Sequence, residues 1–169
     1  MKEIEMKFEV KSFTKVRERL FQIGAKLLWR GIESTQYFDY PDGSLRKKKL
    51  SLRIREWKGH SILVTCKHDL KHGKNAKRRE EFQFETNDKK QVEATFLLLG
   101  LVPTLFYKKR REHWEVEKHV HVELDELEIK KKFVEIEGSQ VKIKTLAKVL
   151  DIQDRPQSFL SYPEILRKK

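Results

Sequence analysis

Polar and apolar residues alternate strictly at the start of the chain. Residues 3–10 read EIEMKFEV, so every second side chain carries a full charge and the intervening side chains are apolar. Alternation with a period of two is typical of a β-strand with one apolar face. The charged face has two possible interpretations at this point, a solvated surface or the wall of an internal cavity.

The same alternation recurs along the chain and predicts seven further strands, mostly antiparallel. Each of the longer segments sets apolar side chains opposite charged ones, and we expect the apolar faces to pack outward against helices. The segments are 36–40, 50–56, 61–67, 79–85, 107–117, 119–127 and 132–138.

Helical spacing of apolar residues predicts two longer helices early in the chain. One follows Ser12 as N-cap and stops at Gly24, and the other follows Asn87 and stops at Gly100. Their expected apolar faces are formed by Phe13, Val16, Leu20 and Ile23 in the first helix, and by Val92, Phe96 and Leu99 in the second.

Two helices are expected near the end of the chain. Ser139 is the predicted cap of the first, and residues 161–169 form a short closing helix. Together with the strands, these helices predict an α+β fold.

Residues 8–25 align without gaps over residues 84–101, which places Gly24 over Gly100. The two stretches share a strand end, an apolar helical face and a terminal glycine. We interpret this similarity as an internal duplication of a strand–helix–strand unit within a single domain.

Composition restricts the class of partner. The chain has 169 residues, of which 38% are charged, and its formal net charge is +12. Such a charge favours an anionic partner: nucleic acid, a membrane surface or a phosphorylated small molecule. Cys66 is the only cysteine, which excludes an internal disulfide. No apolar run has membrane-spanning length and the first strand is no signal peptide, so we expect a cytoplasmic domain.

The charged faces of the predicted strands are sorted by sign. Hard divalent cations prefer carboxylate ligands, whereas a polyphosphate is bound by several Arg and Lys side chains. A cavity that holds a metal beside an anion explains this sorting, and a solvated sheet face stays the alternative. The acidic positions are Glu3, Glu5, Asp125, Glu135 and Glu137, and the basic positions are Arg53, Arg55, Lys67, Lys109 and Arg111.

An ordered set of short motifs resembles one family along nearly the whole chain. EIEMK at residues 3–7 matches the ExExK signature of the CYTH superfamily, the triphosphate tunnel metalloenzymes. The segments QYFDY, LRIR, TCK, RREEF, KKRREHW, VELDEL and FVEIEG follow in the order of that family's strand motifs. The chain departs from the pattern in the turn at 126–133, which lacks glycine, and at Cys66, where an aromatic residue is more usual.

The resemblance implies an eight-stranded antiparallel barrel whose tunnel binds a triphosphate and Mg²⁺ or Mn²⁺, with helices outside. Glu3, Glu5 and Lys7 are the implied catalytic residues. The implied metal ligands are Glu3, Glu5, Asp125, Glu135 and Glu137. The implied triphosphate ligands are Lys7, Arg53, Arg55, Lys67, Arg79, Lys109 and Arg111, and Glu81 is a further tunnel residue.

Three functions stay open on the sequence alone. The length, the YFD strand and the SYPEIL end resemble class IV adenylyl cyclases most, which implies conversion of ATP to cyclic AMP and a homodimer. The second function is hydrolysis of inorganic, thiamine or nucleoside triphosphate. The third and least favoured is a basic RNA-binding module without catalysis. His119 and His121 have metal-like spacing, but surface or packing roles are favoured.

Overall fold

The computed structural model of the protein describes residues 2–57, 61–69 and 77–167. These residues form eight β-strands and five α-helices, which confirms the α+β class. None of these helices combines the length and the apolar composition that a membrane span requires. The strands are β1 Lys2–Val10, β2 Lys26–Asp39, β3 Leu50–Trp57, β4 Ile62–Asp69, β5 Lys77–Thr86, β6 Val102–Glu117, β7 Val120–Leu127 and β8 Lys132–Glu137. The helices are α1 Thr14–Gln22, α2 Ser44–Lys47, α3 Lys89–Leu98, α4 Gln140–Val149 and α5 Tyr162–Arg167.

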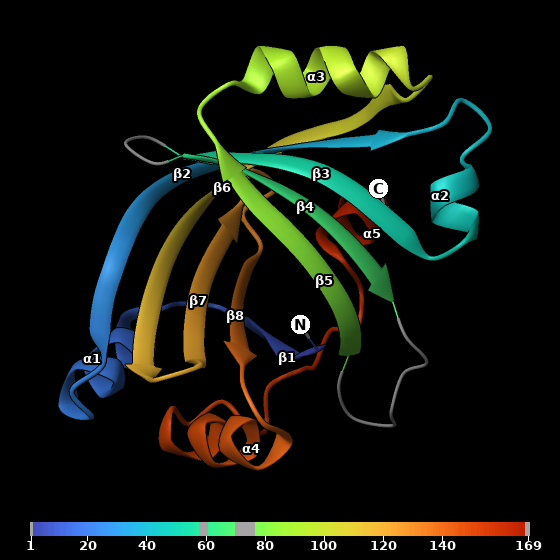
Figure 1. The fold of residues 1–169 in the computed structure, drawn as a ribbon. Helices are drawn as coiled ribbons and strands as arrows, with labels where there is room; N and C mark the ends of the chain where they lie inside the picture. The colour runs from blue at the N-terminus through green and yellow to red at the C-terminus, as the bar shows by residue number, and fades with distance from the viewer. Residues whose placement is uncertain (1, 58–60, 70–76, 168–169) are drawn as a thin grey trace.

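The strands close into an antiparallel barrel (Figure 1). Their order around the barrel is β1-β5-β4-β3-β2-β6-β7-β8, and β8 pairs with β1 to complete the ring. The pairing sets Lys7 opposite Glu135 and Arg111 opposite Asp125. Because side chains alternate between the two faces of a strand, this register brings the charged positions of many strands together inside the barrel.

The largest apolar core lies between the barrel strands and the helices α1 and α4. Figure 1 shows both helices outside the barrel, in the lower part of the view. Phe8 of β1 and Trp114 of β6 contribute the largest side chains, and both are fully buried. Leu20 of α1 and Ile143 of α4 meet them from the helices. Burial of a Leu, Ile or Phe side chain stabilises a fold by about 1.5–3 kcal/mol, so this cluster anchors both helices to the strands.

Two smaller clusters fix the remaining helices. Phe38 and Ile54 pack with the half-buried Phe96 of α3, and the rings of Phe38 and Phe96 meet edge to face at 5.1 Å. Around α5, Tyr162 and Ile165 pack against a third cluster that includes Phe133. The closing helix is therefore packed against the strands of the barrel.

The structure corrects two predicted helix starts. Asp88, and not Asn87, caps α3 by accepting a hydrogen bond from the Gln91 backbone N–H. α1 begins at Thr14, and the Ser12 hydroxyl accepts a hydrogen bond from the backbone N–H of that residue. Ser139 caps α4 as predicted, by accepting from the Lys142 backbone N–H.

Some apolar residues that the sequence pattern assigned to packed faces of helices or strands are exposed. Ile23 and Leu99 are exposed because each is the last residue before the glycine that reverses the chain. Phe82 and Phe84 of β5 are 67% and 56% exposed, because none of the described helices covers this part of β5. The expectation that every apolar face packs against a helix is wrong for this strand.

The two aligned stretches, 8–25 and 84–101, contain corresponding elements. Each holds the end of a strand, then a helix, then a glycine with a left-handed backbone: Gly24 has φ +74° and Gly100 has φ +82°. Only glycine adopts this conformation without strain, which explains both helix stops. An origin by duplication stays a prediction.

Candidate active site

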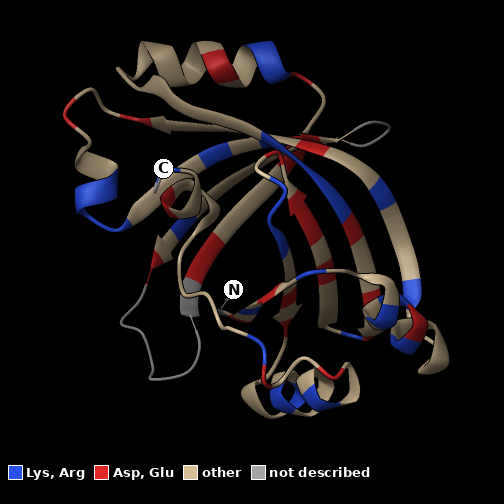
Figure 2. Cartoon of the chain, turned by 180° about the vertical axis from the view of Figure 1, so that it is seen from behind, with Lys and Arg blue, Asp and Glu red and all other residues tan. Residues whose placement is uncertain are grey.

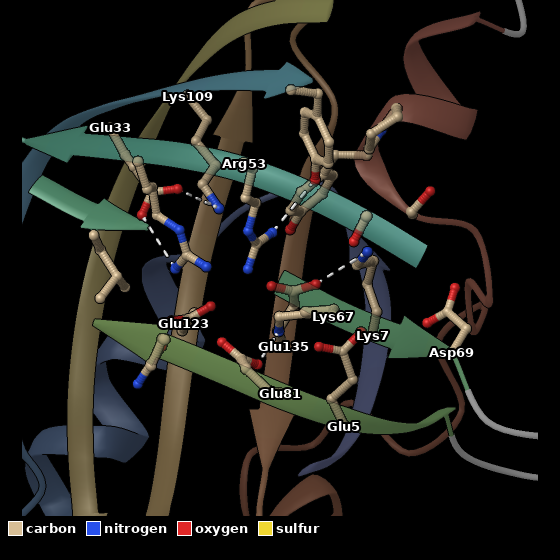
Figure 3. Close-up of a pocket in the computed structure, with 18 of the residues that line it drawn as sticks. Glu5, Lys7, Glu33, Arg53, Lys67, Asp69, Glu81, Lys109, Glu123 and Glu135 are labelled. Atoms are coloured by element: carbon tan, nitrogen blue, oxygen red, sulfur yellow. Dashed lines mark hydrogen bonds and ion pairs between the residues drawn. The ribbon is translucent and has the colours of Figure 1, made fainter. Parts of the chain in front are cut away.

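The barrel encloses a cavity of about 990 Å³ whose wall is mainly charged (Figure 3). Charged positions follow the strands of the barrel (Figure 2). The charged faces of the strands therefore form the wall of an internal cavity, and the alternative of a solvated sheet face is wrong. Of the residues predicted for the site, those that line the cavity are Glu5, Lys7, Arg53, Arg55, Lys67, Glu81, Lys109, Arg111, Glu135 and Glu137. Glu3 and Arg79 pair in the backbone register of β1 and β5, but their side chains lie outside the described part of the structure.

Three carboxylates from neighbouring strands form an acidic group. Glu123 and Asp125 of β7 and Glu135 of β8 each place an oxygen within 4.8 Å of the others. The Nη2 atom of Arg111 lies among them, at 2.5 Å from Glu123 Oε2 and Asp125 Oδ2 and at 3.1 Å from Glu135 Oε2. The guanidinium compensates part of the negative charge, which a buried acidic group requires.

Asp125 differs from the other predicted metal ligands because its oxygens are fully used. Oδ1 accepts from Arg111 Nε at 2.6 Å. Oδ2 accepts from Arg111 Nη2, from Lys109 Nζ at 3.0 Å and from the Tyr162 hydroxyl at 2.7 Å. A carboxylate offers about four lone-pair sites, so these contacts satisfy it. Asp125 is completely buried behind the cavity wall, where it orients Arg111 and Lys109.

Glu33 of β2 is a site residue that the sequence reasoning missed. It is 1% exposed and contacts Lys109 Nζ at 3.2 Å, Arg111 Nη1 at 3.6 Å and Arg55 Nη1 at 3.9 Å. Burial raises the pKa of this carboxyl, but the charges of Arg111 and Lys109 outweigh burial and hold the pKa far below its ordinary value. Glu33 is therefore ionised and holds three cations together.

Two lysines point into the cavity, and each forms an ion pair with a glutamate of a neighbouring strand. Lys7 Nζ contacts Glu135 Oε1 at 3.0 Å and donates to the Leu160 backbone carbonyl at 3.0 Å. It also lies 4.0 Å from the centre of the Tyr162 ring. Lys67 of β4 pairs with Glu81 of β5 at 2.5 Å. These contacts hold both ammonium groups toward the lumen at defined positions.

Arg53 and Arg55 are lumen cations with unused hydrogen-bonding capacity. Among the described residues, Arg53 forms no ion pair, and its Nη1 donates to the Tyr37 hydroxyl at 3.3 Å. The Nε atoms of both arginines are buried without a hydrogen-bond partner in this part of the chain. A buried unsatisfied donor costs about 1–3 kcal/mol, and more if charged, so both guanidiniums are prepared for an anion.

Burial and opposite charges act against each other on the acidic group. Burial raises the pKa of Glu135, but Lys7 and Arg111 overcome it and hold that pKa well below the ordinary value. The same balance, with Arg111 and a hydrogen bond from His113, lowers the pKa of Glu123. Burial and the nearby Asp125 raise the pKa of Tyr162, which keeps its hydroxyl a donor. Glu123 and Glu135 are thus anionic at neutral pH.

Other predicted features can now be located. The glycine-free turn after β7 is possible because Lys130 adopts a left-handed conformation with φ +62°. Cys66 is half-buried, and burial raises the pKa of its thiol. His119 and His121 both line the cavity, although neither belongs to the acidic group described above.

The sequence did carry a signal for Glu33. It lies four residues before Tyr37, so it shares a face with that residue if the strand predicted at 36–40 extends toward the N-terminus. Tyr162 carried no comparable signal, because helical spacing does not show that its hydroxyl reaches Asp125 on β7.

The sequence and the fold both match known proteins. Residues 1–161 match the CYTH domain. A protein from Methanocaldococcus jannaschii, named "Putative adenylate cyclase", is 31% identical over 151 residues, which cover 89% of this chain and 85% of that protein.

Solved structures share the fold. One from Vibrio parahaemolyticus, described as "a putative adenylate cyclase", has a TM-score of 0.85 at 22% identity and covers 98% of this chain and 97% of its own. Another, from Hippeastrum, is described as a "putative adenylyl cyclase" that reveals a dominant triphosphatase activity. It has a TM-score of 0.71 at 17% identity and covers 98% of this chain and 95% of its own.

Proposed function

Because the chain belongs to the CYTH family, we propose that it is a class IV-like adenylyl cyclase, which converts ATP to cyclic AMP and pyrophosphate in the barrel tunnel. The name of the M. jannaschii relative supports this choice. The substrate class follows from the charged lumen, since a polyphosphate chain needs several cations arranged around it.

One observation carries the proposal. Arg53 and Arg55 lie on adjacent lumen positions of β3, and their Nε donors are buried without partners among the described residues. Phosphate oxygens would satisfy these donors, and Lys67, Lys109 and Arg111 line the same cavity. Arg binds phosphate with two parallel hydrogen bonds, which adds orientation to affinity.

In the proposed reaction the ribose 3′-oxygen attacks the α-phosphorus. A bond from O3′ to phosphorus forms, the bond from phosphorus to the bridging oxygen of the β-phosphate breaks, and pyrophosphate leaves with that electron pair. The 3′-hydroxyl proton is released to the solvent, and the lowered pKa values of Glu135 and Glu123 keep these carboxylates ionised. The cations stabilise the charge that develops on the leaving group.

The carboxylates fit a hard divalent cation such as Mg²⁺ or Mn²⁺. Glu123 and Glu135 present oxygens that lie close together, and Glu5 and Glu137 line the same cavity from β1 and β8. These residues would hold the metal ion, with Glu3 as the further predicted ligand. When bound, the ion would neutralise phosphate charge as a Lewis acid.

Hydrolysis of a triphosphate is the second candidate. The Hippeastrum protein with the same fold is described as having a dominant triphosphatase activity. The same cations would bind a terminal phosphate, and attack by water in place of the 3′-oxygen would release inorganic phosphate. The two activities differ in the nucleophile and not in the charged wall.

A product assay tests the proposal. The protein is incubated with ATP, thiamine triphosphate or inorganic triphosphate and Mg²⁺ or Mn²⁺, and cyclic AMP, pyrophosphate and phosphate are separated. We expect cyclic AMP and pyrophosphate from ATP, and loss of at least 100-fold of the rate in Arg53→Gln. Lys108→Gln is the matched control, because that side chain is exposed on the outer face of β6.

Each other result selects another function. Phosphate release without cyclic AMP assigns the triphosphatase. Failure to bind or process any triphosphate, with RNA binding that weakens steeply with salt, assigns the basic RNA-binding module.

A further inference from the structure

Four aromatic rings form a continuous row across neighbouring strands of the barrel. Trp57 of β3 stacks on Trp29 of β2, with centroids 5.4 Å apart and planes 12° apart. Trp29 lies 6.4 Å from His113 of β6, and His113 stacks on His121 of β7 at 5.0 Å and 18°. We call these four residues the aromatic row.

The aromatic row faces the lumen. All four residues line the cavity, and each is only partly buried. Trp29 pairs with His113 across β2 and β6, and Trp57 pairs with Glu33, which is itself a lumen residue. The rings are therefore on the inner face of the barrel, where a ligand can reach them.

The aromatic row adjoins the acidic group. His113 Nδ1 lies 3.4 Å from Glu123 Oε1, and Glu123 contacts Arg111 through its other oxygen. A ligand whose phosphates lie along the cations would place its next chemical group beside these rings. Tyrosines elsewhere in the lumen have other roles: the Tyr37 hydroxyl accepts from Arg53, and the Tyr162 hydroxyl donates to Asp125.

We propose that the aromatic row is a subsite for the planar heterocycle of a nucleoside triphosphate, which makes the tunnel selective for nucleotides over inorganic triphosphate. This inference rests on the proposed triphosphate-processing function and adds the group that the tunnel recognises beyond the phosphates.

The chemistry of the row suits a base. A base stacks on indole and imidazole faces with little dependence on its identity. His121 Nδ1 is buried without a hydrogen-bond partner among residues 2–57, 61–69 and 77–167, so it can bond the polar edge of the base. Inorganic triphosphate has no planar ring to stack on these residues and no polar ring edge to bond, so these contacts do not increase its affinity.

Calorimetry on the full-length protein with Mg²⁺ tests the inference. The probes are methylene-bridged, non-hydrolysable analogues of ATP and of inorganic triphosphate, so turnover does not disturb the measurement. Removing one stacking ring weakens base binding by about tenfold or more. We therefore expect Trp29→Leu and Trp57→Leu to raise the dissociation constant for the ATP analogue by about tenfold. For the triphosphate analogue we expect a change of less than about twofold.

Two further variants separate stacking from cavity shape. Trp57→Phe retains a stacking ring and should restore most of the affinity for the ATP analogue. Phe106→Leu is the control, because Phe106 is an aromatic residue that is 52% exposed and does not line the cavity. It should change neither dissociation constant.

The results test the nucleobase subsite separately from the proposed triphosphate-processing function on which it rests. Equal weakening for both analogues in the Trp variants, or no weakening for either, overturns the nucleobase subsite and leaves triphosphate binding intact. If the unmodified protein binds neither analogue, the proposed function itself is wrong.

Discussion

Asp125 is the residue that organises the cations of the lumen. Its two oxygens accept from Arg111, Lys109 and Tyr162, and the side chain has no access to solvent. A buried carboxylate at this position offsets the positive charge of Arg111 and Lys109 and fixes the orientation of their side chains. Substitution of Asp125 should therefore lower the stability of the fold more than it affects metal binding.

Asp125→Asn should lower the free energy of unfolding by about 1–3 kcal/mol, because an amide has one acceptor oxygen and leaves buried donors of Arg111 or Lys109 without a partner. Urea denaturation measures this loss. Glu126→Gln is the matched control on the outer face of β7, where Glu126 only approaches Lys132 at 3.9 Å. The control should change stability by less than about 1 kcal/mol. A small effect of Asp125→Asn would show that Asp125 does not anchor the cations.

The buried carboxylates also predict how stability depends on pH. The pKa of Glu33 is far below its ordinary value of 4.5, since Arg111 and Lys109 outweigh burial. Above pH 4.5 this residue is ionised in both the folded and the unfolded state, so its ion pairs contribute fully. As the pH falls below 4.5, the unfolded chain takes up the proton first, and the stability is progressively lost.

Urea unfolding between pH 2.5 and 6 should therefore show a steep loss of stability in acid for the unmodified protein. Glu33→Gln should give a shallower dependence, because the substituted side chain no longer titrates. Glu18→Gln, on the exposed face of α1, should run parallel to the unmodified protein. Parallel curves for all three proteins would contradict the contribution assigned to Glu33.

At the scale of elements, alternation predicted the strands whose two faces differ most. Residues 3–10 and 50–56 contrast full charges with apolar side chains, and both lie within strands of the barrel. Alternation did not predict the first half of β2, because Leu27, Leu28 and Trp29 are consecutive apolar residues and Gly31 breaks the pattern. Glu33 was missed with it, although it lies in the middle of that strand.

The sequence pattern could not predict the contacts between strands that are distant in the sequence, and the reason is physical. Alternation shows which residues share a face, but not which residues of another strand lie opposite. The four donors to Asp125 and the stacking of Trp29 on Trp57 depend on barrel register and closure. The family resemblance supplied the barrel, and the register had to come from the structure.

The two helix-ending glycines predict matched effects on stability. Gly24→Ala and Gly100→Ala should each cost about 1–2 kcal/mol, because a side chain strains the left-handed backbone at φ +74° and +82°. Thermal or urea unfolding measures the loss. Gly31→Ala is the control, since nothing lies within 4 Å of an added Cβ there and no left-handed backbone is required. An equal loss at Gly31 would show that backbone strain is not the cause.

At the scale of the whole molecule, the barrel links ligand binding to global stability. The cavity is lined by residues from both ends of the chain, Glu5 of β1 and Arg167 of α5 among them. A triphosphate bound there would contact strands that are distant in sequence but adjacent in the closed ring. Unfolding the barrel therefore requires release of the ligand.

Inorganic triphosphate at 100 times its dissociation constant should raise the free energy of unfolding by about 2.7 kcal/mol. The shift is measured by thermal or urea unfolding with and without the ligand. Arg53→Gln should abolish most of the shift, because it removes a guanidinium that has no ion pair among the described carboxylates. Lys108→Gln, with an exposed side chain on the same barrel, should retain it. A shift that survives equally in both variants would place the anion on the basic outer surface, and the tunnel would not be its binding site.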